Sequence, residues 1–375
     1  MRMSSVYAVP DAPDSDWSIR LRCKARIITL SLLGLVMLLA FWFGSRYPAL
    51  LFKAHHSGDH LASMAFAHDM FHGAGGGTAT RILFGAINWL DSMAIGMSFG
   101  VLFGALMHTV LQFYPLRIGR NYTLNSLKGA LIGMPMGVCA NCAVPMACGL
   151  TRGHGRVEVA LGYLFSSPNF NPVVIAITFT ILPWYFGVIK YAILLGVILL
   201  LVPTLIRYLE RQNPAAPVAV DSGASALRLP DHGCDEPFLA TVRQVLVSYA
   251  KHVWMLFKPT ISLMIVASVL ASALLVLVPW NSLLAHTSPA RFVGLSALSV
   301  FMPVPIALDV LFAGELHRTG VNAGYTMLFL MTLGTYSVIP AIYLWREISR
   351  KLSVFLFLFF VITGSTVGFL FAMFG

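Results

Sequence analysis

The chain has 375 residues, of which 58% are hydrophobic and only 11% are charged, and its mean hydropathy is +0.79. So low a charge content excludes a soluble globular domain. The net charge of +10 would indicate a nucleic-acid partner in a soluble protein. In a membrane protein it is explained by orientation, because Lys and Arg accumulate on the cytoplasmic side, and no nucleic acid is expected as a partner.

Apolar runs recur along the chain, and a run of about 18 residues without a charge is long enough to cross the hydrocarbon layer of a membrane. They predict an all-α polytopic protein surrounded by membrane lipid. The first run follows a basic segment but has no small-residue cleavage site, so we expect an anchoring helix and not a signal peptide. The best candidate spans, in chain order, are Ile27–Gly44, Ser92–Tyr114, Val159–Trp184, Tyr191–Ile206, Pro259–Trp280, Ala323–Trp345 and Leu352–Gly375.

Polar segments divide the chain into two membrane halves. Residues 1–26 are predicted to be a cytoplasmic tail, and residues 207–242, rich in Pro, Ala, Ser and charges, a polar cytoplasmic linker. The first transmembrane half covers 27–206 and includes an extra N-terminal helix and a His-rich outer loop at 45–81. The second half covers 243–375.

Two apolar segments of the first half contain helix-breaking residues. Gly133–Gly149 holds three cysteines and two prolines, and Ser166–Pro172 holds two further prolines. Lipid offers no partner to an exposed backbone group, so irregular backbone at membrane depth survives only against protein or a polar cavity. The two segments therefore indicate a transporter and not a simple anchor.

A weak internal repeat relates the two halves. Met134-Pro135 and Met302-Pro303 are each followed by a Gly-x5-Gly pattern with a basic residue inside it, about 165 residues apart. The second copy is about one helical turn shorter and lacks the thiols. Paired interrupted segments at corresponding positions are typical of transporter binding sites.

The charge pattern then predicts a topology. If Leu131–Leu150 and Leu295–Leu316 are re-entrant, the basic loops, the N-terminus and the linker all fall inside, as the positive-inside rule requires. The C-terminus falls outside. We therefore expect seven full crossings and two broken hairpins, about 7–9 transmembrane segments in two inverted halves, in the cell (inner) membrane with a cytoplasmic N-terminus.

The thiols are the first candidate site. Cys139 and Cys142 are three positions apart, so their sulfurs can face one point, whereas Cys148 joins them only if the break reorients the chain. Soft thiolates bind soft partners such as Cu(I), Zn(II) or trivalent arsenic species. The alternative is packing, because buried Cys behaves as a small hydrophobic residue. A four-thiolate zinc site is not expected, because no second Cys-x-x-Cys exists.

Polar residues at membrane depth supply the other candidates. Asn169 and Asn171, beside Pro172, can bind a solute or simply cap the broken helices. Asp309 is the acid of the second broken segment, and an ionisable residue in the membrane is a functional hypothesis, here a proton or cation site. We expect Lys190 to extend toward the membrane surface.

Histidines crowd the outer loop and form i,i+4 pairs that suit a metal on a helix. Such loops are also often only solvated, so no metal site and no cofactor is assigned. The residues are His55, His56, His60, His68 and His72.

At the broken segments the chain resembles the predicted-permease family that includes the bacterial organoarsenical efflux permeases. That family has a Gly-x-Pro-x-x-x-Cys-x-Cys-Gly-type segment, a Gly-Leu and a Ser-Pro-x-x-Asn-Pro segment. This chain has Gly133-Met-Pro135 followed by Cys139-Ala-Asn-Cys142, then Gly149-Leu150 and Ser167-Pro-Asn-Phe-Asn-Pro172. Cys-x-x-Cys replaces the expected Cys-x-Cys.

The resemblance implies export of a small soft or organic solute, such as a trivalent organoarsenical or metal(loid), through Cys139 and Cys142. Two alternatives remain. One is a membrane thiol-disulfide oxidoreductase, which needs a partner thiol or quinone, and the other is a permease for an oxyanion or organic solute in which the thiols only pack. We expect no enzyme activity. No ATP-binding motif occurs, so any active transport uses a gradient or a separate partner.

Overall fold

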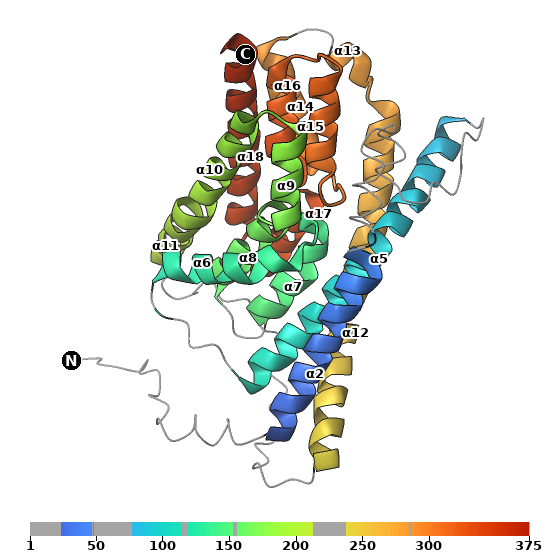
Figure 1. Cartoon of the computed structure of the whole chain (residues 1–375), viewed down its shortest axis with the longest axis vertical. Coiled ribbons are helices and arrows are strands. Elements are labelled where there is room, and N and C mark those ends of the chain that lie inside the picture. The colour runs from blue at the N-terminus through green and yellow to red at the C-terminus, as the bar shows by residue number, and fades with distance from the viewer. Residues whose placement is uncertain are drawn as a thin grey trace, which may run out of the picture.

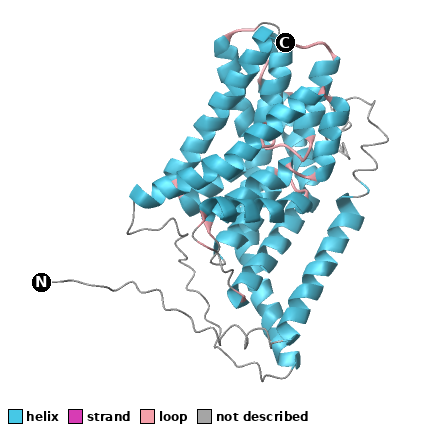
Figure 2. Ribbon diagram, turned by 60° about the vertical axis from the view of Figure 1, so that its left-hand side comes forward, coloured by secondary structure: helices cyan, strands magenta, loops and turns pink. Residues whose placement is uncertain are grey.

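The structure is a computed structural model that describes residues 24–46, 48, 77–114, 119, 121–152, 156–212, 238–284 and 287–374. All secondary structure in these residues is helical, which confirms the predicted all-α class (Figures 1 and 2). Most of the His-rich outer loop, including its five histidines, most of the N-terminal tail and most of the linker lie outside the described residues.

The first half begins with a helix that continues into a π-helical turn. Its elements are α2 (Lys24–Phe41), η1 (Trp42–Arg46), α5 (Thr78–Phe113), α6 (Tyr122–Gly133), η2 (Met134–Met136), α7 (Ala140–Arg152), α8 (Val157–Asn169), α9 (Pro172–Ile181), α10 (Trp184–Gly196), η3 (Val197–Leu201) and α11 (Val202–Gln212).

The second half begins with the longest described helix. Its elements are α12 (Phe238–Leu277), α13 (Trp280–Leu284), α14 (Pro289–Phe301), α15 (Leu308–Arg318), α16 (Ala323–Thr332), α17 (Val338–Tyr343), η4 (Leu344–Ile348) and α18 (Arg350–Phe374).

Five described helical stretches are long and apolar enough to cross a membrane, and α8 with α9 makes a sixth if this bent pair is one span. The five are Arg26–Gly44, Met93–Phe113, Trp184–Arg211, Phe238–Leu277 and Arg350–Phe374. The predicted span Val159–Trp184 is this pair, bent by 43° where α8 gives way to Pro172.

One predicted span needs a correction. The run Ala323–Trp345 is not one continuous helix: α16 ends at Thr332 and α17 begins at Val338. Gly334 adopts a left-handed conformation with φ +72° in the gap. A residue in that region cannot continue a right-handed helix, and Gly adopts it without steric cost. The run of apolar residues therefore hides a break at Gly334, six residues before Pro340 in the first turn of α17.

Apart from α2 and the five-residue helix α13, the element order of the second half repeats that of the first. In each half a long helix (α5, α12) precedes a short helix (α6, α14), a Met-Pro break and a second short helix (α7, α15). A broken pair (α8 with α9, α16 with α17) and a final long helix (α10–α11, α18) follow. The long helices α5 and α12 pack along each other (Figure 1).

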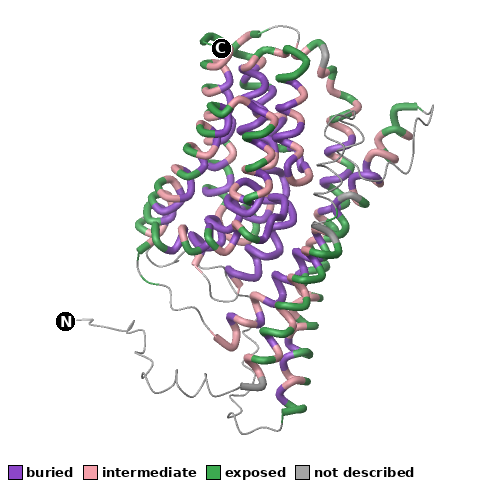
Figure 3. Tube along the Cα trace, in the orientation of Figure 1, coloured by how far each residue is buried: buried purple, intermediate pink, exposed green. Residues whose placement is uncertain are grey.

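Burial separates an inner group of helices from an outer one. Figure 3 shows that α7, α8 and α16 are buried along most of their length. The outer helices α2, α12 and α18 expose large apolar side chains, such as Leu35, Ile265 and Ile362. This distribution is what lipid requires, because apolar side chains face the acyl chains and polar ones face protein.

Small residues allow the inner helices to approach closely. Gly100 and Gly104 form a Gly-x-x-x-Gly motif on α5, and a methyl group on either would collide with a backbone carbonyl of α7, at Cys142 or Pro145. Close packing of this kind contributes to association in lipid, where no hydrophobic effect drives helices together. The thiol-bearing helix is therefore held directly against α5.

Candidate functional site

Four helix interruptions in the described part of the chain meet in the protein interior. They lie at residues 134–139, 170–171, 302–307 and 333–337. Two come from each half, so residues far apart in sequence contribute to one site. At each interruption, buried backbone groups lose helical partners and must be satisfied by other groups.

Cys139 and Cys142 lie at the first interruption. Their Sγ atoms are 2.7 Å apart, and the Met93 Sδ atom of α5 lies 3.8 Å from the Cys139 Sγ atom. The backbone N–H of Cys142 also donates to the Cys139 sulfur over 3.3 Å. The two side chains are 3% and 1% exposed. The i,i+3 spacing thus does bring two sulfurs to one point, and a thioether stands beside them.

Cys148 does not join this pair. It lies two turns further along α7, near Arg152, Tyr343 and Glu347. No cluster of three or more Cys, His, Asp or Glu side chains suited to a metal is found among the described residues. Because α7 continues through Pro145 without a break, Cys148 stays in separate surroundings, and Met93 is the third sulfur at the pair.

Asn141, between the two thiols, connects the interruptions. Its Nδ2 donates to the backbone oxygen of Val304 over 3.4 Å, and its Oδ1 accepts from the Ser337 hydroxyl at 2.5 Å. One amide thus satisfies groups at both interruptions of the second half. Trp89 of α5 adds a bond from its indole N–H to the Pro303 oxygen, 2.9 Å long.

The predicted asparagines also lie at this junction. Asn169 donates to the Phe165 oxygen within α8, and its Oδ1 lies 3.5 Å from the Thr335 hydroxyl. Asn171 caps α9 by accepting from the N–H of Val173, and it donates to the Met134 oxygen over 3.3 Å. Pro172 follows as the first residue of α9, where its missing N–H leaves nothing unsatisfied.

Both asparagines are therefore buried structural links between interruptions in this arrangement, as well as candidates for solute contact. Asn169 faces Thr335 of the other half, and Asn171 holds the backbone just before the thiols. A solute that displaced either amide would loosen a contact between broken segments.

The sequence prediction for Lys190, which contacts Asp309, was wrong. Lys190 does not extend to the membrane surface: it is 0% exposed, and its ammonium contacts the Asp309 carboxylate at an Nζ–Oδ2 distance of 2.5 Å. Asp309 lies in the first turn of α15, immediately after the interruption at 302–307. An acid buried in the membrane is stabilised by a partner of opposite charge, and that partner comes from α10.

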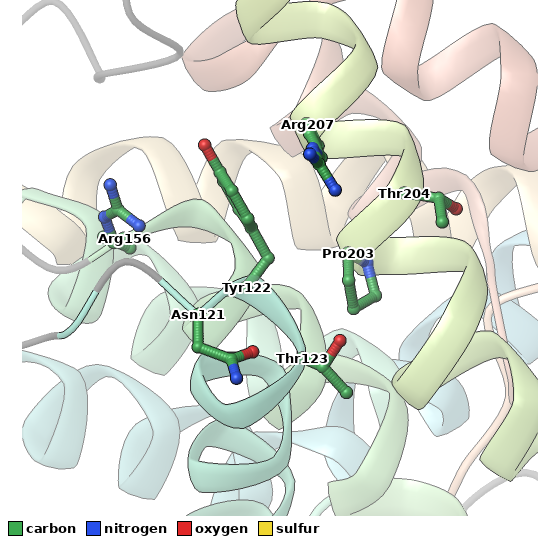
Figure 4. Close-up of a pocket in the computed structure, with 7 residues that line it drawn as sticks. All are labelled: Asn121, Tyr122, Thr123, Arg156, Pro203, Thr204 and Arg207. Carbon is green, nitrogen blue, oxygen red and sulfur yellow. The ribbon is translucent and has the colours of Figure 1, made fainter.

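A pocket of about 760 Å³ lies elsewhere, between the start of α6 and the first turns of α11 (Figure 4). Arg156 and Arg207 lie on opposite sides of Tyr122, whose hydroxyl donates to Glu210 at 2.5 Å. This hydrogen bond raises the pKa of the Tyr122 phenol. The pocket does not include the thiols, and its other lining residues are Asn121, Thr123, Pro203 and Thr204.

The comparisons with known proteins match this arrangement to one family. The profile of a family described as predicted permease matches residues 82–373. The chain belongs to the predicted permease family. The match begins inside α5 and extends to the end of α18, so it includes all four interruptions.

One curated relative has detectable sequence similarity. The UPF0718 protein YraQ of Escherichia coli (strain K12) is 26% identical over 253 residues, which cover 66% of this chain and 68% of that protein. No solved structure matches the chain. Membership of this family and the several long apolar helices show that the protein is a membrane permease that crosses the membrane several times.

Sequence reasoning missed several residues of the junction. Lys190 stands alone in the apolar run of α10, and that isolation was a usable signal. Met93 and Trp89 had none, because each resembles an ordinary buried residue until its partner is known. Asn141 had one, since a polar amide in an apolar segment favours a site there, but the sequence did not show its partners. Thr335 and Ser337 were hidden in a span that was expected to be unbroken.

Proposed function

We propose that this permease exports a small soft solute, with a trivalent organoarsenical as the leading substrate, and that Cys139 and Cys142 bind it. The observation that carries the proposal is the buried pair of sulfurs at the meeting point of four helix interruptions. Soft thiolates favour soft acceptors of this kind. The resemblance of the Cys-containing segment to the organoarsenical permeases supports the same class of solute.

The binding chemistry needs no oxidant. A methylarsenite molecule, CH3As(OH)2, exchanges its two hydroxyls for two thiol sulfurs, so that two As–S bonds form, two As–O bonds break, and two waters leave. The reverse exchange releases the solute. Arsenic stays trivalent and the thiols are not oxidised, which distinguishes this role from that of a thiol-disulfide oxidoreductase. We accordingly propose transport and not catalysis.

We further propose that the two halves are inverted, with seven full crossings and two re-entrant hairpins, α6–α7 and α14–α15. Residues that the charge pattern assigns to one side of the membrane lie together. Arg152 forms a salt bridge with Glu347, 2.7 Å long, at the expected cytoplasmic side. At the expected outer side, Phe186 packs against His317 and Phe371.

In this topology the N-terminus and the linker 207–242 are cytoplasmic, the C-terminus is external, and the membrane is the cell (inner) membrane. The four interruptions meet near its midplane, as in transporters built from repeats. Asp309, beside one of them, is the proposed entry point for a proton gradient. The proposed partners are the solute and the surrounding lipid.

The test is resistance and transport with single thiol replacements. Cells that express the wild type should resist methylarsenite, and inside-out vesicles should accumulate it. Cys139→Ser or Cys142→Ser should abolish both effects while the protein remains in the membrane, because one remaining sulfur cannot form the second As–S bond. Cys148→Ser is the matched control and should transport normally, because Cys148 lies away from the pair.

Normal transport by both serine variants of the pair would show that these thiols only pack. The substrate would then have to be sought among oxyanions or organic solutes. That result would be compatible with a permease function but would refute the proposed sulfur site.

A further inference from the structure

The ion pair between Lys190 and Asp309 joins the two halves of the protein. Lys190 lies on α10 of the first half, and Asp309 lies on α15 of the second. The ammonium is fully buried, and the Asp309 side chain is 7% exposed. A charge pair at this depth can persist only if each charge keeps its partner, because removing one leaves the other buried and uncompensated.

Few other titratable groups face the pair. On α10, the Tyr191 ring lies 5.9 Å from the Lys190 Nζ atom, and the Tyr191 hydroxyl bonds to Thr178 of α9. Neither α9 nor the part of α16 near Asp309 brings a second acid or base, since α9 has no titratable side chain and α16 has only Tyr325, which stacks on Phe292.

The remaining charges of α15 lie at its other end. Glu315 and Arg318 pair with each other on the exposed surface, and His317 packs against Phe186. Among the described groups packed around it, Asp309 therefore has Lys190 as its direct counter-charge.

Asp309 is also placed to influence the broken segments. It is the second residue of α15, two positions after the interruption at 302–307. Its carboxyl carbon lies 3.5 Å from the position that a Cβ atom would occupy on Gly334, the left-handed residue of the fourth interruption. Val304 of the third interruption in turn receives a hydrogen bond from Asn141, between the two thiols. The ion pair is thus linked to the sulfur site through the interruptions themselves.

We propose that Lys190 is a positioning residue that competes with the transported proton for the Asp309 carboxylate, and that the pair locks α15 against α10 until a proton displaces it. The proposal rests on the proposed function, whose site it regulates. A proton from the outer side binds a carboxylate oxygen and neutralises it, so the Lys190 ammonium loses its counter-charge and the contact between α10 and α15 opens.

Opening frees α15 and its interruption to move relative to α10, which changes the side from which the junction is reached. When the proton leaves Asp309 toward the cytoplasm, the carboxylate again attracts Lys190 and the lock closes. One proton is taken from one side and released on the other in each cycle. The ammonium keeps its proton throughout.

The experiment compares neutral replacements of one or both partners. Asp309→Asn leaves a buried cation unpaired, so the melting temperature of this variant should fall. The double variant Lys190→Met/Asp309→Asn removes both charges and should recover thermal stability. It should still bind methylarsenite at the thiols, but an imposed pH gradient should no longer drive accumulation in inside-out vesicles. Glu315→Gln/Arg318→Met, which removes the exposed ion pair of the same helix, is the matched control and should accumulate solute as the wild type does.

Gradient-driven accumulation at the wild-type level by the stable double variant would overturn the proposal, because the pair would then be structural only. A second measurement does not depend on the substrate. The melting temperature of the wild type minus that of the double variant should fall as the pH is lowered, since protonated Asp309 no longer holds Lys190. A difference that stays constant with pH would also overturn the proposal. If the wild type binds no methylarsenite, the proposed substrate is wrong. The pH dependence of the difference in melting temperature still tests the proposed role of the ion pair.

Discussion

Asn141 and Asp309 occupy equivalent positions in the two halves. Each is the second residue of the helix that follows a Met-Pro break. In the first half an amide at this position connects the interruptions, and in the second half a carboxylate holds a lysine of the opposite half. Corresponding positions in the element order thus carry two different polar groups.

Asn141→Ala should destabilise the junction. The change leaves the Val304 oxygen and the Ser337 hydroxyl without the amide, and each buried polar group left unsatisfied costs about 1–3 kcal/mol. The melting temperature in detergent measures the loss. Ser262→Ala is the control, since its hydroxyl bonds only to Lys258 of its own helix at the exposed surface. Equal stability of the two variants would mean that water or another side chain replaces the amide.

Gly334→Ala should destabilise the protein through its backbone. The site has room for a methyl group, with the nearest atoms 3.5 Å away, but its φ of +72° is unfavourable for any residue with a Cβ atom. The expected loss is about 1–2 kcal/mol. Gly294→Ala in α14 is the opposite case, because it lies in a helix with nothing within 4 Å. Chemical denaturation should show a gain of roughly 0.5–1 kcal/mol there. Unchanged stability of Gly334→Ala would imply that the interruption can adopt a turn without a left-handed residue at this position.

At the scale of elements, the position of α7 depends on α5. The Gly-x-x-x-Gly face of α5 allows the carbonyl groups of Cys142 and Pro145 to approach its backbone. The same helix supplies Met93 to the thiols and Trp89 to the third interruption. A shift of α5 would therefore move several groups of the junction at once.

Gly104→Leu should separate α5 from α7 and impair both folding and solute binding. The added side chain meets backbone atoms of Pro145 and Met146, which cannot rotate away, and overpacking of this kind typically costs about 1–3 kcal/mol or more. Gly196→Leu, at a position with nothing within 4 Å, controls for the loss of a helical glycine. The readouts are the yield of monodisperse protein and methylarsenite binding. Wild-type binding by Gly104→Leu would show that the close contact is dispensable.

The sequence predicts the elements better than it predicts their contacts. The prolines at 135 and 172 correctly marked two interruptions, because a ring without an N–H breaks a helix by local chemistry. Gly334 went unnoticed, since glycine is common in membrane helices and signals a break only when its φ is known. The spacing of Cys139 and Cys142 is local and was readable. The pairing of Lys190 with Asp309 spans 119 positions, and only the folded chain shows it.

At the scale of the whole molecule, the paired element order and the distribution of charge support the same arrangement. If the halves are inverted, the broken hairpin of each half enters from a different side, and the interruptions meet between them. The contact of Arg152 with Glu347 places the end of the first hairpin beside the segment before α18. The sides themselves can be assigned by labelling.

Gln212 and Ser282 are suited to that labelling, because Gln212 is the last residue of α11 and Ser282 is exposed in the short helix α13. In a background with Cys23 and Cys234 replaced by serine, Gln212→Cys should react with a membrane-impermeant maleimide only from the cytoplasmic side. Ser282→Cys should react only from outside, and so should a cysteine at Gly375. Leu35→Cys, on the exposed apolar face of α2, should react from neither side because lipid covers it.

The prediction follows from the basic residues near each position. Arg207 and Arg211 precede Gln212, whereas the segment 281–289 carries no Lys or Arg, and it is Lys and Arg near the ends of the spans that determine orientation. Reaction of Gln212→Cys from outside would mean either that α6–α7 crosses the membrane completely, so that the halves are not inverted, or that the whole protein has the opposite orientation. In both cases Asp309 would face a proton from the opposite side. Reaction of Gln212→Cys and Ser282→Cys from the same side would instead rule out a full crossing by α12, despite its 40 residues.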